Sequence, residues 1–417
     1  MDYHIAAGEF LRKHHMHPDD IDATEFCRSF TGEMAAGLAG RPSSMGMFPA
    51  YLSCESEPMK ETGVLVVDAG GTNLRCARMH FAADGSIVTD AIRKSHMPGT
   101  RGEVDAAELF DAIAREIMAV GADCELACIS FSYPCEVLPN GDGRVIRLTK
   151  ELHVTNLVGS TVCEPLERAL KKLGAPGARR WRLINDTVGT LLGGMAQCDR
   201  ALYDDFVGLI LGTGTNTCAS FPAADISKSP EAMAMGGSVV VNLESGGFDR
   251  FTLGDADELL DKASVQPGKQ RLEKTISGGY YPQLLRHALG LAVKEGLWAE
   301  ESARKLFDTD FGMREVDLLC SDTSAENAFA REVNALLLER AAKLTACSLS
   351  SIILYRSPAP GSRICICSDG TTIARNPLLR PLSEKYLAEL LSPHGVRAEY
   401  FQVSDATLLG SAYAGLL

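Results

Sequence analysis

Apolar and polar positions between residues 63 and 121 first follow the spacing of strands and then that of a helix. Residues 63–92 contain three mainly apolar segments, divided by a turn at Gly70-Gly71 and by Asp84-Gly85, a dipeptide typical of tight hairpins. Residues 105–121 show helical spacing up to Gly121. The apolar positions that define this helix are Leu109, Phe110, Ile113 and Ile117. The pattern predicts three strands followed by one helix.

The same series of elements continues and then begins again. The pattern predicts a buried strand at 126–134, a helix at 160–174, a strand at 180–186 and a helix that begins at 187. A second apolar segment with a glycine-rich turn starts at residue 206. The order β-β-β-α-β-α-β-α fits a mixed sheet with helices on both faces, present twice.

The remaining segments are mainly helical in pattern. The first 55 or so residues are predicted to form helices with breaks. A long helix is predicted from about 324 to 350, opened by a capping box between Thr323 and Glu326. We expect this helix to lie against the second sheet.

A chain of 417 residues exceeds what one hydrophobic core usually holds, so we expect an α/β protein of two lobes. The predicted small lobe contains residues 63–190 and 404–417, and the large lobe contains 1–62 and 191–403. No low-complexity linker separates them, which predicts a hinge near residue 190.

Two glycine turns have the same polar tip. The segments "VVDAGGTNLR" (66–75) and "FVGLILGTGTNTC" (206–218) each run from an apolar strand into Gly, Thr and Asn. Such a turn can be a plain hairpin whose glycines supply positive φ, or a cradle whose backbone N–H groups bind phosphate. Gly71-Thr72-Asn73 matches Gly214-Thr215-Asn216, and this repetition favours an anion site over the plain hairpin.

A third polar motif is Asn185-Asp186, where a buried strand runs directly into a helix. A carboxylate at the carboxyl end of a strand faces the crevice in which α/β sheets bind ligands. Asp is also a favoured N-cap, so capping is the alternative role for Asp186. The position of the motif between two phosphate-type turns favours a catalytic role.

Composition excludes several classes of protein. Hydrophobic residues make up 46% and charged residues 23%, as in ordinary globular proteins. A net charge of −13 without a Lys/Arg-rich stretch argues against nucleic-acid or anionic-membrane partners. The sequence has neither a signal-peptide core at its start nor an apolar run of about 18 residues, so we expect a cytoplasmic protein.

The cysteine and histidine patterns do not favour a metal site. Thirteen cysteines include no CxxC pair, which predicts reduced thiols rather than a disulfide framework or a zinc site. Cys365 and Cys367 fit one face of a strand. The cluster His14, His15 and His17 is predicted to be a solvated helix end rather than a set of metal ligands.

Eight motifs, taken in order, resemble the signatures of the hexokinase family, which shares a superfamily with actin and the heat-shock ATPases. They are VDAGGTNLR (67–75), SFSYP (130–134), LTKEL (148–152), INDTVGT (184–190), LGTGTNTC (211–218), NLESGGF (242–248), LEKTISGGYY (272–281) and CSDGTTI (367–373). The resemblance runs from about residue 64 to 417, and its specificity rests on the ordered set. It implies two lobes, each built on a ribonuclease-H-like mixed sheet, with the active-site cleft between them.

The resemblance also implies transfer of the γ-phosphate of ATP, with Mg²⁺, to the 6-hydroxyl of a hexose such as glucose. Asp186 would be the general base, with Lys150 as a second catalytic residue, and Asp68 would reach Mg²⁺ through water. The implied sugar-binding residues are Ser132, Thr149, Lys150, Asn185, Asp186, Asn216, Glu244 and Glu273. The implied nucleotide-binding residues are Asp68, Gly70, Gly71, Thr72, Asn73, Arg75, Gly212, Thr213, Gly214, Gly370, Thr371 and Gly410.

General chemistry agrees with these implied roles. Carboxylates and amides select a sugar by leaving a wrong epimer unpaired. Phosphoryl transfer needs in-line positioning, a metal and an Asp that aligns the nucleophile. A P-loop kinase is excluded because GxxxxGK[ST] does not occur. Arg75 has an alternative role as an ion-pair partner across the strand meander.

The sequence departs from the family pattern at three positions near the implied sugar site. Leu148 stands where an aromatic residue is common, Glu151 where glycine is, and Ser245 where tryptophan is. These changes concern the choice of hexose rather than the transfer chemistry. The alternative functions are a non-catalytic sugar-binding regulator on the same fold and a nucleotide-switch ATPase. We expect a monomer or a homodimer.

Overall fold

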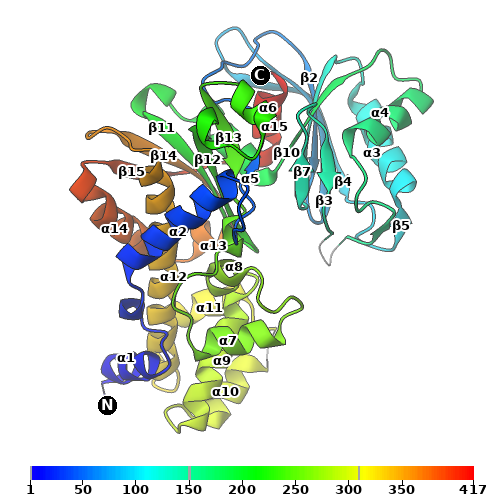
Figure 1. The fold of residues 1–417 in the computed structure, drawn as a ribbon. Helices are drawn as coiled ribbons and strands as arrows, with labels where there is room; N and C mark the ends of the chain where they lie inside the picture. Colours follow the sequence, from blue (N-terminus) through cyan, green and yellow to red (C-terminus); the bar gives the residue numbers. More distant parts are fainter. Residues whose placement is uncertain (1, 149–151, 309) are drawn as a thin grey trace. The chain divides into compact units, whose positions relative to one another are not determined.

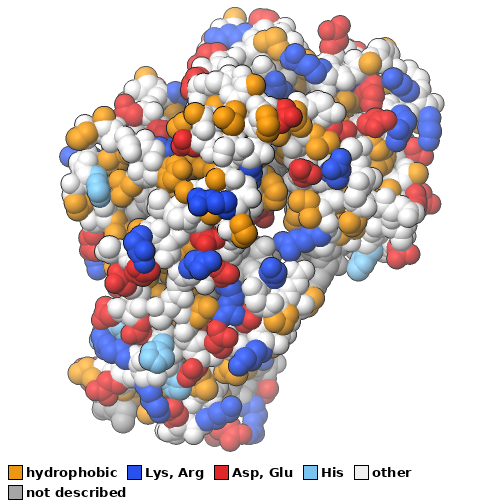
Figure 2. Space-filling view, viewed as in Figure 1, with side chains coloured by type: hydrophobic (Ala, Val, Ile, Leu, Met, Phe, Trp, Pro, Cys, Tyr) orange, Lys and Arg blue, Asp and Glu red, His pale blue; other side chains and the backbone are white. Residues whose placement is uncertain are grey.

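The computed structural model describes residues 2–148, 152–308 and 310–417, and the chain forms two compact units. Unit 1 contains Met1–Gly46, Ala201–Thr217 and Leu243–Gln402, and unit 2 contains Met47–Arg200, Cys218–Asn242 and Val403–Leu417. Both units mix helices and strands, which Figure 1 labels. Acidic and basic side chains are interspersed over the face shown in Figure 2.

Unit 2 contains a five-stranded sheet with the order β10-β6-β2-β3-β4. β2, β3 and β4 form an antiparallel meander, and β6 and β10 continue the sheet parallel to β2. The strands are β2 (Val64–Ala69), β3 (Asn73–Phe81), β4 (Ile87–His96), β6 (Leu126–Phe131) and β10 (Arg180–Ile184). The helices that alternate with them are α3 (Ala106–Val120), α4 (Cys163–Lys172) and α5 (Asp186–Gln197). The predicted order of elements is confirmed for this half.

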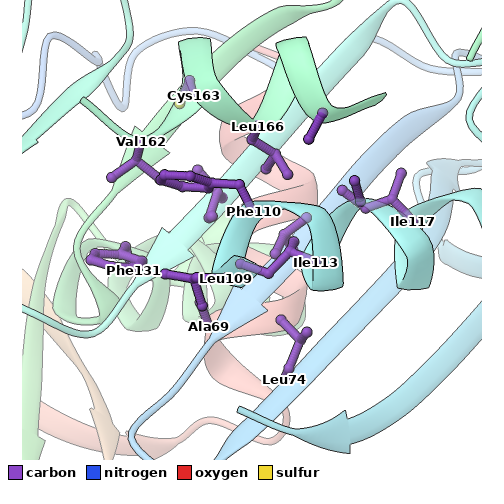
Figure 3. Packing of buried hydrophobic residues seen from close by; sticks show 14 of the residues in the cluster. Ala69, Leu74, Leu109, Phe110, Ile113, Ile117, Phe131, Val162, Cys163 and Leu166 are labelled. Atoms are coloured by element: carbon purple, nitrogen blue, oxygen red, sulfur yellow. The ribbon is translucent and has the colours of Figure 1, made fainter. Parts of the chain in front are cut away.

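The core of unit 2 forms where α3 and α4 cover one face of this sheet (Figure 3). Side chains at helical spacing on α3 point toward the strands and are almost completely buried. They are Leu109, Phe110, Ile113 and Ile117, as the spacing predicts. A capping box between Asp105 and Glu108 starts α3, and Gly121 ends it with a φ of 97° that favours glycine.

On the opposite face of the sheet, α15 (Ala406–Gly415) packs closely against α5. The contact is lined by Gly189 and Gly193 of α5 and by Gly410 of α15. A Cβ atom on Gly410 would overlap the carbonyl of Gly189, and one on Gly193 would lie 2.5 Å from the carbonyl oxygen of Ala406. The two helix backbones approach this closely because the three residues lack side chains.

The second sheet has the order β1-β13-β12-β11-β14-β15. Apart from β1, it repeats the first sheet: a meander of β11, β12 and β13, then β14 and β15 added parallel. β12 begins in unit 1 and ends in unit 2. The strands are β1 (Phe48–Pro49), β11 (Asp205–Leu211), β12 (Thr215–Pro222), β13 (Ser238–Asn242), β14 (Arg363–Asp369) and β15 (Arg397–Gln402). The predicted duplication of a mixed α/β sheet is confirmed.

The long helix of unit 1, α12 (Ala328–Tyr355), contacts β11 of the second sheet, as predicted, and also α1, α2, α8, α9, α11 and α14. The other helices of unit 1 are α1 (Tyr3–Lys13), α2 (Ala23–Leu38), α7 (Asp255–Ala263), α8 (Arg271–Ile276), α9 (Tyr281–Lys294), α10 (Glu300–Phe307), α11 (Met313–Cys320), α13 (Thr371–Arg375) and α14 (Leu379–Leu391). Unit 2 also contains α6 (Pro230–Ala234) and four short strands. These are β5 (Val104–Asp105), β7 (Cys135–Val137), β8 (Gly143–Val145) and β9 (Val154–Thr155).

The predicted start of the long helix is wrong. α12 begins at Ala328 after Asn327, so Thr323 and Glu326 lie in the preceding turn and form no capping box. That turn is held by Asp322, which accepts hydrogen bonds from Ser324 N and from the side chain of Asn327. Glu326 instead pairs with Lys305. A local Asx turn therefore displaces the helix start by one turn.

The predicted solvated helix end is also wrong for two of its three histidines. His15 is exposed, but the side chains of His14 and His17 are each only 9% exposed. His14 contacts Asp255 and Glu295, and His17 Nδ1 accepts the backbone N–H of Asp19. These histidines are buried because α1 packs onto other parts of unit 1. The described residues contain no group of three or more His, Cys, Asp and Glu side chains arranged to hold a metal.

The predicted lobe boundaries stay a prediction, and the compact units divide the chain differently. Residues 47–62, 191–200, 218–242 and 403 belong to unit 2, where β13 contacts α5, whereas the sequence assigns them to the large lobe. Cys365 and Cys367 lie on one face of β14 with their Sγ atoms 3.8 Å apart, as predicted. Among the helices in the described ranges, none is both long and apolar enough to cross a bilayer.

Substitution of Gly410 by Ala is expected to lower the free energy of unfolding by at least about 1–3 kcal/mol, because the added methyl group forces α15 away from α5. The measurement is urea denaturation monitored by circular dichroism.

The matched control is Gly32→Ala in α2, where a Cβ atom would meet nothing within 4 Å. This exposed change is expected to stabilise the protein by about 0.5–1 kcal/mol, since Ala is the better helix former. Equal effects of the two substitutions would contradict the packing argument.

Candidate active site

In unit 2, three strands present polar residues at one edge of the five-stranded sheet. The register pairs Ser130 of β6 with Asp68 of β2 and with Ile184 of β10, so the three carboxyl ends are level. Ser132 therefore follows β6, and Asn185-Asp186 follows β10, at the edge where Asp68 is the next-to-last residue of β2. This is the edge at which α/β sheets bind ligands.

The turn between β2 and β3, residues 70–72, is fixed by hydrogen bonds to its backbone and has open space next to Gly71. Gly70 N donates to Asn73 O at 3.0 Å, and the Tyr133 hydroxyl donates to the carbonyls of Gly70 and Gly71 at 3.2 and 3.4 Å. Neither glycine has a positive φ, so the turn does not need them for hairpin geometry. A Cβ atom on Gly71 would meet nothing within 4 Å, and Thr72 is exposed. The space over the turn is what a bound phosphate requires.

Asp68 is nearly buried and is oriented by Arg75 from the paired strand β3. Nε and an Nη atom of Arg75 lie 2.7 and 2.6 Å from Oδ2 of Asp68. Burial disfavours the charge on Arg75, but Asp68 and then Asp405 outweigh it and raise the pKa of Arg75. The alternative role of Arg75 as an ion-pair partner across the meander is confirmed. It fits a nucleotide-binding role as well.

Asp186 is not the cap of its helix. Asn185 is the N-cap of α5, and its Oδ1 accepts the backbone N–H of Thr187 at 2.9 Å. Asp186 occupies the first helical position, half-buried, with the Thr187 hydroxyl 3.4 Å from its Oδ1. The N-cap alternative for Asp186 is therefore wrong. Its carboxylate lies at the N-terminus of α5, where the helix dipole favours the ionised form that a general base requires.

In unit 1, the second glycine turn is enclosed by two other segments, 278–279 and 370–372. The carbonyl of Gly212 accepts hydrogen bonds from Gly278 N at 2.8 Å and from the Thr372 hydroxyl at 2.9 Å. Gly279 N donates to Thr213 O at 2.9 Å. A Cβ atom on Gly212 would lie 3.2 Å from the Cα of Gly370. The structure thus brings together Gly212, Thr213, Gly214, Gly370 and Thr371, and Gly370 has a φ of 117°.

The polar residues assigned to the sugar in unit 1 also converge. Oε2 of Glu273 accepts the backbone N–H of Thr215 at 3.0 Å. Oδ1 of Asn216 accepts the backbone N–H of Ser245 at 3.3 Å, and its Nδ2 donates to Glu244 at 3.4 Å. Glu244 has a φ of 55° and a ψ of 44°, the left-handed conformation that favours glycine. A strained backbone at a polar cluster is typical of a functional site.

A buried set of ion pairs holds the short helix that carries Glu273, and nothing in the sequence pattern indicated it. Lys274 Nζ lies 2.5 Å from Oδ1 of Asp261 on α7, and Arg271 lies 2.6 Å from Oδ2 of the same carboxylate. Burial alone would raise the pKa of Asp261, but hydrogen bonds from Lys274 and Gly268 N and the charge of Arg271 lower it. Asp261 therefore stabilises the fold at pH values above its unfolded pKa of about 3.9.

Three of the predicted site residues need separate comment. Thr149 and Lys150 lie outside the described residues. Gly410 is buried within α15, where its contact with Gly189 explains the need for glycine. Its nucleotide-binding role stays a prediction.

Substitution of Asp261 by Asn is expected to lower the free energy of unfolding by about 3–5 kcal/mol, because it leaves Lys274 buried without a counter-charge and Arg271 with Glu258 as its remaining carboxylate partner. Urea denaturation at neutral pH measures the change. Glu164→Gln, which breaks an exposed pair with Arg168, is the control and is expected to cost at most about 1 kcal/mol. A loss at Asp261 no larger than that of the control would contradict the argument.

Replacement of Glu244 by Gly or by Ala separates its conformation from its carboxylate. Both variants remove the side chain that faces Asn216, but only Gly relieves the left-handed backbone. The Gly variant is expected to be more stable than the Ala variant by about 1 kcal/mol, with equal losses of sugar binding. Denaturation curves and sugar titrations of both variants measure these effects. Equal stability would show that the backbone at Glu244 carries no strain.

Two family models described as hexokinase match residues 7–196 and 206–417. The chain is 29% identical over 429 residues to Hexokinase-7 of Oryza sativa subsp. japonica, covering 92% of this chain and 91% of that protein. It is 29% identical over 355 residues to Hexokinase-3 of Mus musculus, covering 77% of this chain but only 37% of that protein.

Among solved structures, the fold is similar to a hexokinase from Schistosoma mansoni complexed with glucose, with a TM-score of 0.73 and 23% identity over 99% of this chain and 98% of that chain. A further hexokinase crystal structure gives a TM-score of 0.78 at 22% identity over 100% and 99% of the two chains. Together with the two ordered family matches, this shows that the chain belongs to the hexokinase family and is a hexose kinase.

Proposed function

We propose that this hexose kinase transfers the γ-phosphate of ATP to the 6-hydroxyl of glucose, with Asp186 as the general base. The observation that carries the proposal is the placement of Asp186 in unit 2. Asp186 follows β10 at the edge of the sheet where Asp68 lies next to the end of β2, while Asn185 is the N-cap of α5. An aspartate at this place in the sheet has the position that a general base for an attacking hydroxyl requires.

The two glycine turns supply the phosphate contacts. Turn 70–72 offers backbone N–H groups and the exposed Thr72 hydroxyl, with open space above Gly71. Turn 212–214 in unit 1 is fixed by Gly278, Gly279 and Thr372, so its shape is preformed. Donors that are fixed before the substrate arrives stabilise transferred charge without reorganisation.

The residues around Asp68 fit a magnesium ion that is reached through water. Both contacts from Arg75 fall on Oδ2, and within the described residues no hydrogen bond to Oδ1 is found. A carboxylate oxygen is the kind of ligand that Mg²⁺ prefers, and Mg²⁺ commonly keeps several of its waters. When bound, the ion would neutralise charge on the phosphates. Asp68 would orient it, and Arg75 would hold Asp68.

The sugar-binding set combines carboxylate and amide groups suited to a ring of hydroxyls. Asn216, Glu244 and Glu273 converge in unit 1, and Ser132 and Asn185 lie at the sheet edge in unit 2. We infer glucose as the preferred hexose because the similar Schistosoma structure is described as complexed with glucose. Acceptors paired with specific hydroxyls reject an epimer by leaving a polar group unpaired.

The departures from the family pattern have structural counterparts near these residues. Ser245 is buried, and its backbone N–H donates a hydrogen bond to Oδ1 of Asn216. Leu148 packs against the core of unit 2. These two departures replace a large side chain with a smaller one, whereas Glu151, which replaces glycine, lies outside the described residues. They support a test of several hexoses rather than of glucose alone.

The test is a coupled ADP-release assay with Mg-ATP against glucose, mannose, fructose, galactose and N-acetylglucosamine. Asp186→Asn is expected to lower kcat by about 10²–10⁴-fold with glucose, since it removes the base but keeps the shape of the side chain.

Asp84→Asn is the matched control, because Asp84 lies in the exposed turn between β3 and β4, where its side chain accepts hydrogen bonds from Ser86. It is expected to retain full activity. ADP release without dependence on sugar would indicate a switch ATPase, and sugar binding without turnover would indicate a regulator.

A further inference from the structure

The carboxylate of Asp405 makes a contact for which no role has been assigned. Asp405 is the N-cap residue of α15, yet its side chain accepts no hydrogen bond from the helix it begins. Its Oδ1 instead lies 2.6 Å from an Nη atom of Arg75. Asp is among the best capping residues, so a cap aspartate directed away from its helix forgoes that stabilisation.

Arg75 connects Asp405 to Asp68. Its Nε and one Nη atom contact Oδ2 of Asp68, the other Nη atom contacts Asp405, and the Thr407 hydroxyl accepts a further bond at 3.1 Å. The planar guanidinium group is fixed by partners at three points. The side chains of Arg75 and Asp68 are only 19% and 8% exposed, so solvent weakens their contact little, whereas the Asp405 side chain is 61% exposed and its contact with Arg75 is screened more.

The backbone that presents Asp405 is itself rigid. Gln197 at the end of α5 binds Ser404 on both sides: its Nε2 donates to Ser404 O at 2.9 Å, and its Oε1 accepts from the Ser404 hydroxyl at 2.8 Å. The glycine contact between α5 and α15 follows immediately. Asp405 has a φ of 46°, so this anchoring also maintains a left-handed backbone.

We propose that Asp405 is a positioning residue for the metal-bound nucleotide, acting through Arg75 on Asp68. This inference rests on the proposed function. The three side chains together carry a charge of −1, because one guanidinium is shared between two carboxylates. Without Asp405, Arg75 would neutralise Asp68 alone, and the carboxylate that faces the metal would lose much of its attraction for a divalent cation. Asp405 also keeps Arg75 in the orientation that leaves Oδ1 of Asp68 accessible.

The charge argument predicts different effects of Asp405→Asn on binding of an ATP analogue with Mg²⁺ and without it. The variant Asp405→Asn is expected to weaken binding of a non-hydrolysable ATP analogue with Mg²⁺ by about fivefold to thirtyfold. Binding of the same analogue in the presence of a chelator is expected to stay equal or to tighten, because one negative charge near the phosphates is removed. A merely structural role would weaken both. Isothermal titration calorimetry with and without Mg²⁺ measures the two affinities.

The controls separate charge from folding. Asp405→Glu keeps the charge and is expected to keep the effect of Mg²⁺. Asp405→Ser also removes the charge and can cap the helix as Asn can, so it repeats the test with a second neutral residue and is expected to lose the effect. Asp123→Asn is the matched control and is expected to behave as wild type. Asp123 is an exposed aspartate that pairs with Arg78, an arginine on β3, the strand that also carries Arg75.

Two results would overturn the inference, and they are distinguishable. If wild type binds the analogue more tightly with Mg²⁺, and Asp405→Asn and Asp405→Ser retain that difference, Asp405 has no positioning role. If wild type itself shows no effect of Mg²⁺ on binding, the proposed function fails, and the inference fails with it.

Discussion

The close contact between α5 and α15 is the constraint on which the candidate site of unit 2 depends. α5 begins at Asp186 and α15 begins after Asp405, so the two carboxylates are placed by how these helices pack. The backbones meet where Gly189 faces Gly410, a distance that any side chain would increase. Packed protein interiors transmit such displacements instead of absorbing them. The glycines therefore determine where the acids lie, although none of them has chemistry of its own.

In unit 1 the candidate site residues are positioned by hydrogen bonds and ion pairs, whereas in unit 2 they are positioned by glycine contacts between two helices. The turn at 212–214 is held by carbonyls that accept N–H groups of Gly278 and Gly279 and the Thr372 hydroxyl. The helix that supplies Glu273 is held in turn by the buried pair of Asp261 and Lys274. Ion pairs of this kind contribute little net stability compared with apolar packing, but they fix one geometry. A fixed geometry suits α8, because this helix positions the carboxylate of Glu273.

Much of the fold was predictable because it follows from local periodicity. The apolar side chains of α3 and the meander from β2 to β4 lie where their spacing predicts them. The candidate site was predictable where a motif is contiguous, as in Gly212-Thr213-Gly214. The predicted capping box was wrong because Asp322, which lies outside the motif, accepts hydrogen bonds from Ser324 and Asn327 and so forms a turn there. His14 was misassigned because its partners Asp255 and Glu295 are about 240 to 280 residues away in the chain.

Hydrophobic periodicity could not reveal the non-glycine residues that have a left-handed backbone conformation. Nine non-glycine residues of the described chain have positive φ, and three of them adjoin the candidate site: Glu244, Gln270 and Asp405. Glu244 contacts Asn216, Gln270 immediately precedes the helix that supplies Glu273, and Asp405 contacts Arg75. A left-handed residue costs about 1–2 kcal/mol, so its persistence requires surroundings that fix it. Here those surroundings are the glycine contact in unit 2 and the ion pairs of α7 and α8 in unit 1. Close contacts within each unit thus support its strained polar residues, and this explains why stability and candidate chemistry occupy adjacent residues of the same helices.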